Sequence, residues 1–250
     1  MTRRSESREV YADLRVRPPL VVRADGRGFG KLLREADKPY DLDFAGAMAK
    51  AARRFFEESS LDPAIAFTFS DEVNLLFPEA PFNGRLEKID SVVAGSLSGH
   101  LSLALGRAVA MDARSIPLCT GEICEYFAER QDEAWRNHVF SSGFYALVAD
   151  GLAPDEAMGQ LRGMKEAEIH ETLFARGTNL AKSPAWQRRG ILIRRVRIDG
   201  EVEGVIEGAG DGGRGGKEKR ERMKIIEDWE PPLFRSVEGK RLLDGTIRHI

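Results

Sequence analysis

Alternating and periodic apolar positions divide the first part of the chain into short strands and a helix. The apolar run at 19–24 is rich in β-forming residues and stops at a glycine cluster, which predicts a strand. Residues 41–60 repeat apolar side chains at helical spacing and end in serines, which predicts an amphipathic helix. The apolar runs at 64–69 and 73–77 predict a β-hairpin. The tip of this hairpin carries Ser70, Asp71 and Glu72.

The next two segments complete a familiar order of elements. Residues 85–104 again carry apolar side chains at helical spacing, and 107–112 predict a further strand. Strand, helix, hairpin, helix and strand in this order are typical of a ferredoxin-like βαββαβ layout. We therefore expect an α+β fold with two helices on one face of an antiparallel sheet.

The pattern turns helical after residue 121. We expect one long or broken helix over 122–151 and two shorter helices after it, over 153–164 and 166–177. The end of the chain predicts a strand, a flexible glycine-rich loop and a short closing strand at 190–198, 208–219 and 226–234. The change of character predicts a core of residues 1–120 and a second segment, residues 121–250, which has a basic tail and packs on the same domain.

Composition indicates a soluble protein with a real core, since 42% of its 250 residues are hydrophobic. No apolar run approaches the roughly 18 residues that span a membrane, and the N-terminus has no apolar stretch of a signal peptide. The two cysteines, Cys119 and Cys124, lack the partners of a zinc site, so we expect reduced thiols in a cytoplasmic protein.

The formal net charge of −2 does not indicate a nucleic-acid partner, but the distribution of charge is uneven. Basic residues gather at 186–197 and 217–224, where they can supply phosphate contacts. Charge alone favours the simpler interpretation that both are solvated surfaces. The candidates for contact with an RNA backbone are Arg188, Arg189, Arg194, Arg195, Lys217, Lys219 and Arg220.

Three acidic side chains follow strand ends that a βαββαβ sheet places next to each other. Asp25 follows the first strand, and Asp71 and Glu72 lie at the hairpin tip. Clustered carboxylates repel one another unless a cation neutralises them, and oxygen ligands beside phosphate select Mg²⁺. Two such ions support in-line phosphoryl transfer, so the cluster points to nucleotidyl transfer. The alternative is that both segments are ordinary polar turns.

The glycines after Asp25, in ADGRGFGKL at 24–32, match neither the dinucleotide-binding pattern nor the Walker A pattern. Glycine at these positions still allows backbone N–H groups to approach triphosphate oxygens closely.

These motifs together resemble the tRNA-His guanylyltransferases and their relatives, which extend RNA in the 3′-to-5′ direction. The motifs occur in family order over most of residues 18–195. They are ADGRGFGKL (24–32), KPYD (38–41), FSDEVNLLF (69–77), MDAR (111–114), the run YFAERQD (126–132) and NLAKSPAWQRRGILI (179–193).

The resemblance implies a domain like the palm of conventional polymerases, with two Mg²⁺ ions held by Asp25, the Gly26 carbonyl and Asp71. It implies Asp25, Asp71 and Glu72 as catalytic residues, with Glu72 beside the metals. It also implies contacts to the GTP triphosphate from the backbone of Asp25, Gly26, Arg27, Gly28, Phe29 and Gly30, from Ser70 and Asp71, and from a phosphate-binding lysine, Lys38. Arg85 and Lys88 look like a second triphosphate contact, although a solvated helix face is an equal alternative.

The family reaction begins with ATP-dependent activation of a 5′-monophosphorylated tRNA, after which the 3′-hydroxyl of GTP attacks the activated phosphate. A 5′-triphosphate makes the activation unnecessary. Relatives assemble as dimers or tetramers, so the resemblance implies a homodimer or homotetramer that acts on tRNA, above all tRNA-His.

One departure from the family pattern concerns the segment at 135–144. Trp135 stands where eukaryotic members carry a histidine, which resembles the archaeal and bacterial type and favours template-directed addition or tRNA 5′-end repair. His138 is out of register, and we expect it to be structural. The other functions left open are repair without a preference for tRNA-His, a palm-type nucleotide cyclase and a non-catalytic tRNA-binding protein.

Overall fold

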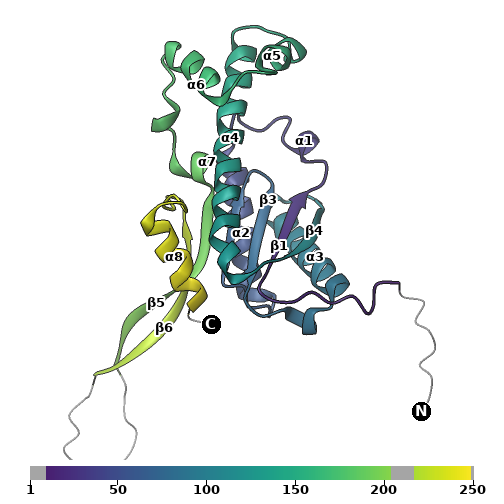
Figure 1. Ribbon diagram of the computed structural model, residues 1–250, viewed down its shortest axis with the longest axis vertical. Helices are drawn as coiled ribbons and strands as arrows, with labels where there is room; N and C mark the ends of the chain where they lie inside the picture. Colours follow the sequence, from purple (N-terminus) through teal and green to yellow (C-terminus); the bar gives the residue numbers. More distant parts are fainter. Residues whose placement is uncertain (1–9, 204–216, 249–250) are drawn as a thin grey trace, which may run out of the picture.

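A computed structural model describes residues 10–203 and 217–248 of the chain, and its centre is one six-stranded sheet (Figure 1). The strands lie in the order β4-β1-β3-β2-β5-β6, and every neighbouring pair is antiparallel. Their bounds are β1 Leu20–Gly26, β2 Ile65–Phe69, β3 Glu72–Phe77, β4 Met111–Pro117, β5 Ile191–Glu203 and β6 Lys217–Asp228. The fold is therefore α+β with an antiparallel sheet, as predicted.

Helices cover both faces of the sheet. Their bounds are α1 Phe29–Leu32, α2 Leu42–Glu58, α3 Leu86–Leu105, α4 Ile123–Ala149, α5 Pro154–Leu161, α6 Glu166–Ala175, α7 Ala185–Arg189 and α8 Val237–Arg248. Helices α2 and α3 pack on one face, while α4 crosses the other and carries α5 and α6 at its far end (Figure 1).

The alternation of side chains along β1 decides which residues face α4. Leu20, Val22 and Ala24 belong to the core that includes α2 and α3, whereas Val21 belongs to the core that includes α4. Because side chains of a strand alternate between faces, Arg23 and Asp25 share the α4 face with Val21. The polar end of this face lies beneath α4.

Strand β4 begins at Met111, so the predicted strand at 107–112 is misplaced by several residues. Helix α3 ends at Gly106, which has the left-handed φ of 65°. Residues of the following turn then fold back onto the helix, since the hydroxyl of Ser102 accepts a hydrogen bond from the Val109 N–H at 3.0 Å. The Met111 N–H donates to Ser98 at 2.9 Å, and only from there does the chain pair with β1.

The predicted closing strand at 226–234 is also wrong. Strand β6 ends at Asp228, before Pro231 and Pro232, because proline has no N–H to donate to a ladder. The strand instead begins at Lys217, within the predicted glycine-rich loop, and pairs with β5 along its length. The rest of that loop, up to residue 216, lies outside the described residues.

The segment after residue 121 continues the sheet, and a buried side chain of α4 holds parts of this segment together. Strand β5 pairs with β2, so β5 and β6 extend the same sheet. The side chain of Gln131 on α4 donates to the carbonyls of Arg189 and Pro232, both at 3.2 Å, and accepts from the Phe234 N–H at 2.8 Å. Within residues 10–203 and 217–248, no helix combines the length and apolarity needed to cross a membrane.

Candidate functional site

The three carboxylates named above meet at one end of the sheet. Asp25 on β1 lies opposite Glu72 on β3 in the strand register. The Gly26 N–H donates to the Asp71 carbonyl at 3.1 Å, which ties the hairpin tip to the end of β1. The proximity of Asp25, Asp71 and Glu72 follows from the adjacency of the first and third strands. The part of the chain that the structure describes contains no group of three or more His, Cys, Asp or Glu side chains arranged to hold a metal.

Asp71 lies in the tight turn between β2 and β3. Ser70 occupies the left-handed region at φ 50° and places its hydroxyl 3.3 Å from a carboxylate oxygen of Asp71. Burial raises the pKa of Asp71, hydrogen bonds from its own backbone and from Ser70 lower it in part, and the charge of Asp25 raises it further. A bound cation would remove this penalty.

Glu72 is held by side chains from two other positions. Asn74 donates to Oε1 at 2.7 Å, and Nη1 of Arg130 lies 3.4 Å from Oε2. Burial raises the pKa of Glu72, while the Asn74 hydrogen bond and the charges of Arg130 and Arg23 lower it in part. Both carboxylate oxygens of Glu72 therefore already have partners in the chain.

Two arginines surround Asp25. Its Oδ2 atom lies 3.5 Å from Nε of Arg23 and 3.1 Å from Nη2 of Arg114, which also contacts Asp112 at 3.2 Å. Oδ2 of Asp25 and Nε of Arg23 are nevertheless buried without a hydrogen-bond partner of proper geometry. An acidic oxygen is thus left with unused capacity to bind a cation.

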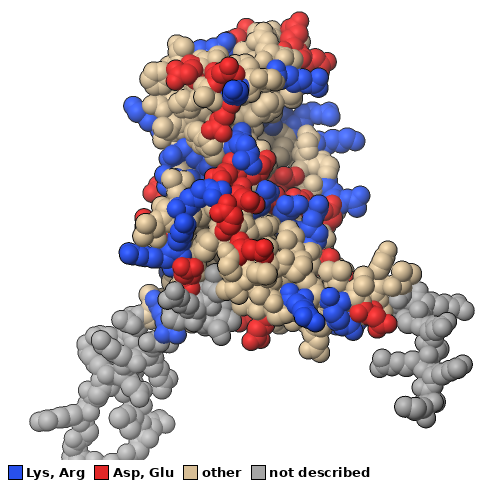
Figure 2. Space-filling model, viewed as in Figure 1, with Lys and Arg blue, Asp and Glu red and all other residues tan. Residues whose placement is uncertain are grey.

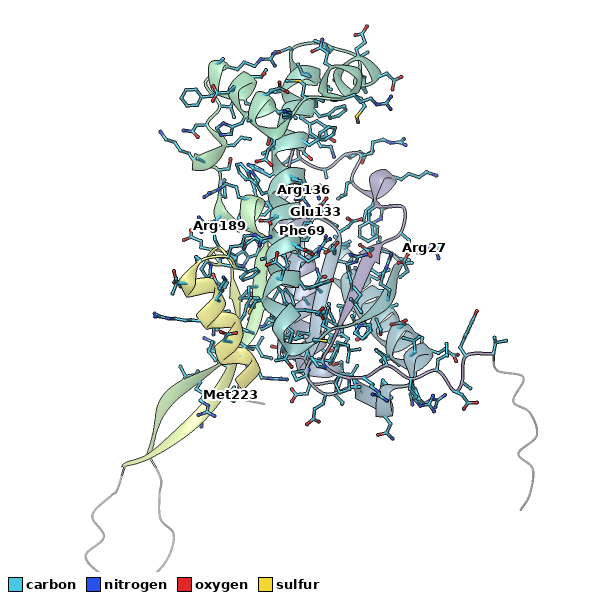
Figure 3. All side chains as sticks on the ribbon, viewed as in Figure 1. Arg27, Phe69, Glu133, Arg136, Arg189 and Met223 are labelled. Carbon is cyan, nitrogen blue, oxygen red and sulfur yellow. The ribbon has the colours of Figure 1, made fainter. Side chains whose placement is uncertain are left out.

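An open cavity of about 260 Å³ lies over these groups. The residues that line it are Arg23, Asp25, Phe69, Ser70, Asp71, Glu72, Arg114, Arg130, Glu133 and Asn137. Figure 2 shows acidic and basic side chains close together across the middle of the face that α4 crosses. Figure 3 shows Phe69 and Glu133 together beside α4. The cavity offers carboxylates to cations and arginines to anions.

A second cavity, of about 160 Å³, adjoins the first and is largely apolar. Both are lined by Phe69, Ser70 and Asn137. The second cavity is also lined by Leu33, Lys38, Tyr40, Phe44, Met48 and Trp186. The rings of Tyr40 and Trp186 meet edge to face at 5.9 Å between centroids. Such a pocket suits a flat aromatic group whose polar end reaches Ser70.

Lys38 lies at this second cavity rather than among the carboxylates. Its ammonium group donates to the Leu33 carbonyl and lies 5.7 Å from the centre of the Tyr145 ring.

The glycine segment between β1 and α1 offers fewer backbone donors than the sequence suggests. The N–H groups of Gly26 and Arg27 already donate to the carbonyls of Asp71 and Ala110. Gly28 adopts a left-handed φ of 72°, and Gly26 is so close to the Phe29 ring that a Cβ would lie 2.6 Å from it. Of the backbone N–H groups expected to contact a triphosphate, only those from Gly28 to Gly30 remain without a partner named here. The Arg27 side chain is exposed and lies away from Phe69 and Glu133 (Figure 3).

Arg85 and Lys88 do not lie beside the carboxylates of the same chain. Strand β3 begins at the acidic cluster and runs away from it, and α3 starts beyond its far end. There the backbone of Arg85 forms an isolated antiparallel β-bridge with Arg15, and Nζ of Lys88 lies 4.6 Å from the centre of the Phe82 ring.

Three of the seven basic candidates for RNA contact bind groups inside the chain. Arg188 donates to the Ser183 carbonyl, and Arg189 donates to the Pro231 carbonyl. Arg195 pairs with Asp62 and lies 5.2 Å from the centre of the Phe56 ring. Arg194 lies on β5 with its Nε buried and unpartnered. The side chains of Lys217, Lys219 and Arg220 lie outside the described residues.

His138 and Trp135 belong to the packing of α4. His138 is 1% exposed, and its Nε2 lies 3.0 Å from the Ser183 hydroxyl. Burial, aided by the charge of Arg188, lowers the pKa of His138 to about 4, so the ring is neutral at pH 7. The Trp135 indole N–H donates to Glu166 on α6.

Sequence reasoning missed five residues around the carboxylates. They are Arg23, Asn74, Arg114, Tyr126 and Arg130. Two simple signals could have found them: Arg23, Asn74 and Arg114 each lie two positions from an acidic residue on the same strand face, and Tyr126 and Arg130 are one helical turn apart on α4.

Three comparisons relate this geometry to known proteins. The family model described as tRNAHis guanylyltransferase (Thg1) matches residues 3–127. The tRNA(His) guanylyltransferase of Schizosaccharomyces pombe is 27% identical over 197 residues, which cover 73% of this chain and 75% of that protein.

Solved structures share the fold. A bacterial tRNA(His) guanylyltransferase (Thg1)-like protein in complex with ATP superposes with a TM-score of 0.72 at 21% identity and covers 95% of this chain and 94% of its own. Such a protein in complex with GTP gives a TM-score of 0.69 at 22% identity, with 95% and 93% covered. The chain therefore belongs to the tRNAHis guanylyltransferase family, which is a family of nucleotidyltransferases.

Proposed function

We propose that this protein is a 3′–5′ nucleotidyltransferase that adds GMP, or a nucleotide chosen by a template, to the 5′ end of tRNA. The observation that carries the proposal is the meeting of Asp25 and Asp71 at the ends of adjacent strands, next to a cavity suited to a nucleobase. Family membership and the α+β sheet support a palm-like arrangement of the ferredoxin-like kind for this site.

The residues at the end of β1 fit a pair of Mg²⁺ ions. Oδ2 of Asp25 is buried beside Arg23 and Arg114 without a hydrogen bond of proper geometry, and burial disfavours the charged form of Asp71 until a cation is present. Asp25, the Gly26 carbonyl and Asp71 would hold the two ions. When bound, such ions activate an attacking hydroxyl and neutralise charge on the leaving oxygens of a phosphoryl transfer.

The apolar cavity would bind the base of the incoming nucleotide. Phe44, Met48 and Trp186 supply apolar surface, and Ser70 joins this cavity to the carboxylates, so phosphates of the same nucleotide would lie between the two. The N–H groups of Gly28, Phe29 and Gly30, with Lys38, are the remaining candidates for triphosphate contact. The bacterial relatives solved with ATP and with GTP support the choice of a purine nucleoside triphosphate.

The reaction of this nucleotide with a 5′-triphosphorylated tRNA needs no further reagent. The 3′-hydroxyl oxygen of GTP forms a bond to the α-phosphorus at the RNA 5′ end, the bond from that phosphorus to the bridging oxygen breaks, and pyrophosphate leaves with the proton accepted by solvent. A 5′-monophosphorylated tRNA would first need adenylyl transfer from ATP. Arg23, Arg114 and Arg130 surround the place where the phosphates would gather.

The extent of the catalytic unit is part of the same proposal. All three carboxylates precede residue 120, which supports a catalytic core of residues 1–120. The segment 121–250 adds α4, whose Arg130 lines the cavity, and two strands of the sheet. Assembly as a homodimer or homotetramer is proposed from the family alone.

Template-directed addition is favoured over addition to tRNA-His alone. Trp135, which stands at the position of the eukaryotic histidine, donates to Glu166 and belongs to the packing of α4 on α6, so it offers no titrating group to the reaction. Repair of 5′-truncated tRNAs in general is therefore the second candidate function.

Calorimetry with GTP tests the nucleotide site. We expect the protein to bind GTP more tightly with Mg²⁺ than without, and we expect Asp71→Asn to abolish this difference, because the variant lacks a charged metal ligand. Asp155→Asn, the same change at an exposed position of α5, is the matched control and should behave like the wild type. Metal-independent GTP binding by the wild type would contradict the proposed site.

A further inference from the structure

A chain of side chains connects helix α4 to the acidic cluster. The hydroxyl of Tyr126 donates to Oδ1 of Asn74 at 2.7 Å, and Nδ2 of Asn74 donates to Oε1 of Glu72 at 2.7 Å. One helical turn further along α4, Arg130 reaches the other oxygen of Glu72. Asn74 is fully buried and Glu72 is 9% exposed, so these bonds do not compete with bulk water.

The three carboxylates therefore differ in what they can still bind. Oδ2 of Asp25 forms ion pairs with Arg23 and Arg114 but accepts no hydrogen bond of proper geometry, and Asp71 contacts one side-chain hydroxyl at 3.3 Å. Glu72 by contrast has both oxygens engaged, one by an amide and one by a guanidinium group. A carboxylate that is fixed on both oxygens is poorly placed to coordinate a metal as well.

We propose that Glu72 is not a metal ligand but a positioning residue, and that Tyr126, acting through Asn74, and Arg130 fix its carboxylate over the end of β1. This inference rests on the proposed nucleotidyl transfer. Glu72 lies opposite Asp25 in the register, so its fixed negative charge sets the field in which Asp25 and Arg23 are oriented. Through Tyr126 and Arg130, the position of α4 on the sheet thereby determines the orientation of the Glu72 carboxylate.

The hydroxyl of Tyr126 is suited to this role because it stays protonated and therefore always donates a hydrogen bond to Asn74. Burial raises the pKa of Tyr126 to about 12, so the group keeps its proton at any pH at which the enzyme works. The amide of Asn74 passes the constraint on, since its acceptor oxygen binds Tyr126 while its donor nitrogen binds Glu72. Removal of the hydroxyl leaves the amide held through its nitrogen alone, which donates to Glu72 and, at 3.4 Å, to the Phe67 carbonyl.

A double-mutant cycle on GTP addition to 5′-triphosphorylated tRNA tests the coupling. We expect Tyr126→Phe to lower kcat by about 10-fold or more while the KM for GTP changes by less than about twofold, because partners of this kind tune activity more than binding. In a Glu72→Gln background the same change should lower kcat by less than about twofold further. An equal loss in both backgrounds would mean that Tyr126 acts independently of Glu72, and it would overturn the proposal.

Metal binding gives a readout that does not depend on activity. Titration with Mn²⁺, followed by its paramagnetic resonance signal, should give the wild-type number of sites for Glu72→Gln and fewer sites for Asp71→Asn. Loss of a site in Glu72→Gln would overturn the assignment. If the wild type adds no GTP at all, the proposed function fails, whereas the titration still tests the role of Glu72.

Tyr11→Phe is the matched control for the hydroxyl deletion, since Tyr11 is 60% exposed and lies before β1, away from the cluster. It should leave kcat, KM and metal binding unchanged. A similar loss of kcat in Tyr11→Phe would mean that the effect of Tyr126→Phe reflects general instability, and it would contradict the proposal.

Discussion

Asp71, which we propose as a metal ligand, shows at the scale of one residue how a buried carboxylate weakens the fold that holds it. Its pKa is raised mainly by burial, which means that the folded chain holds the proton of Asp71 more tightly than the unfolded chain does. For such a group the favourable contribution to stability is fully present below the unfolded pKa and is lost as the pH rises through the folded pKa. The metal-free protein therefore carries this cost at neutral pH.

We accordingly expect Asp71→Asn to be more stable than the metal-free wild type at neutral pH, because asparagine has the same shape and no charge to bury. The advantage should shrink as the pH falls through the raised pKa of Asp71, where the folded wild-type carboxyl takes up its proton. Urea unfolding at a series of pH values measures it. Asp155→Asn should show no such trend, and an Asp71→Asn variant less stable than wild type at neutral pH would contradict the electrostatic interpretation.

The same scale shows what sequence could and could not predict about the site. Asp25, Asp71 and Glu72 come together because strand alternation and a tight hairpin are local properties, and the neighbourhood of the first and third strands follows from the order of elements. Whether Arg130 can reach Glu72 depends on which face of the sheet α4 covers. That is a tertiary fact, and Arg114 and Arg130 come from elements far along the chain.

Helix α4 is the element that joins the two halves of the molecule. Its buried Gln131 bonds three backbone groups of the segments that precede β5 and α8, and Tyr126 and Arg130 on the same helix reach Asn74 and Glu72. Loss of the Gln131 amide would leave two carbonyls and one N–H buried without partners, which is costly.

Gln131→Met keeps the length of the side chain but removes these hydrogen bonds. We expect it to lower the free energy of unfolding by about 2–4 kcal/mol, measured by denaturant titration. Gln160→Met, at an exposed position of α5, should change stability by less than about 0.5 kcal/mol. A Gln131→Met variant as stable as the control would show that these bonds contribute nothing.

Element boundaries were harder to predict than element types. The start of β4 is set by hydrogen bonds from residues 109 and 111 to serines on α3, and no local pattern records such contacts. Strand β6 is rich in lysine and glutamate, which strands disfavour, and it forms because β5 offers a long edge to pair with. Arg85 and Lys88 follow β3, which begins at the acidic cluster and runs away from it, so the order of elements already places them at the opposite end of the sheet.

At the scale of the whole molecule, β5 and β6 form a two-stranded ribbon that extends beyond the body of the protein (Figure 1). Val196 pairs with Lys224 and Ile198 with Arg222, so these residues and Arg194 share one face of the ribbon. Lys224 and Arg222 are exposed, and Met223 lies on the opposite face, 59% exposed (Figure 3). A face of aliphatic and basic side chains suits contact with an RNA backbone.

We expect the double change Arg222→Ala and Lys224→Ala to weaken tRNA binding at all sequences alike. The logarithmic slope of affinity against salt should fall by about 2, since two phosphate contacts are lost. Filter binding over a range of salt concentrations measures this slope. Lys50→Ala with Arg107→Ala removes two exposed charges near the opposite face of the sheet and is the control. An unchanged slope in the ribbon variant would exclude the ribbon from the RNA interface.

The pairing of Asp25 with Asp71 is tested by incorporation of labelled GTP into 5′-triphosphorylated tRNA-His that lacks its first G. We expect the wild type and Asp155→Asn to extend this RNA in the presence of Mg²⁺. Asp25→Asn and Asp71→Asn should each lower kcat by at least about 100-fold while remaining folded, because each loses a charged metal ligand. Extension at the wild-type rate by either variant would contradict the proposed two-metal site.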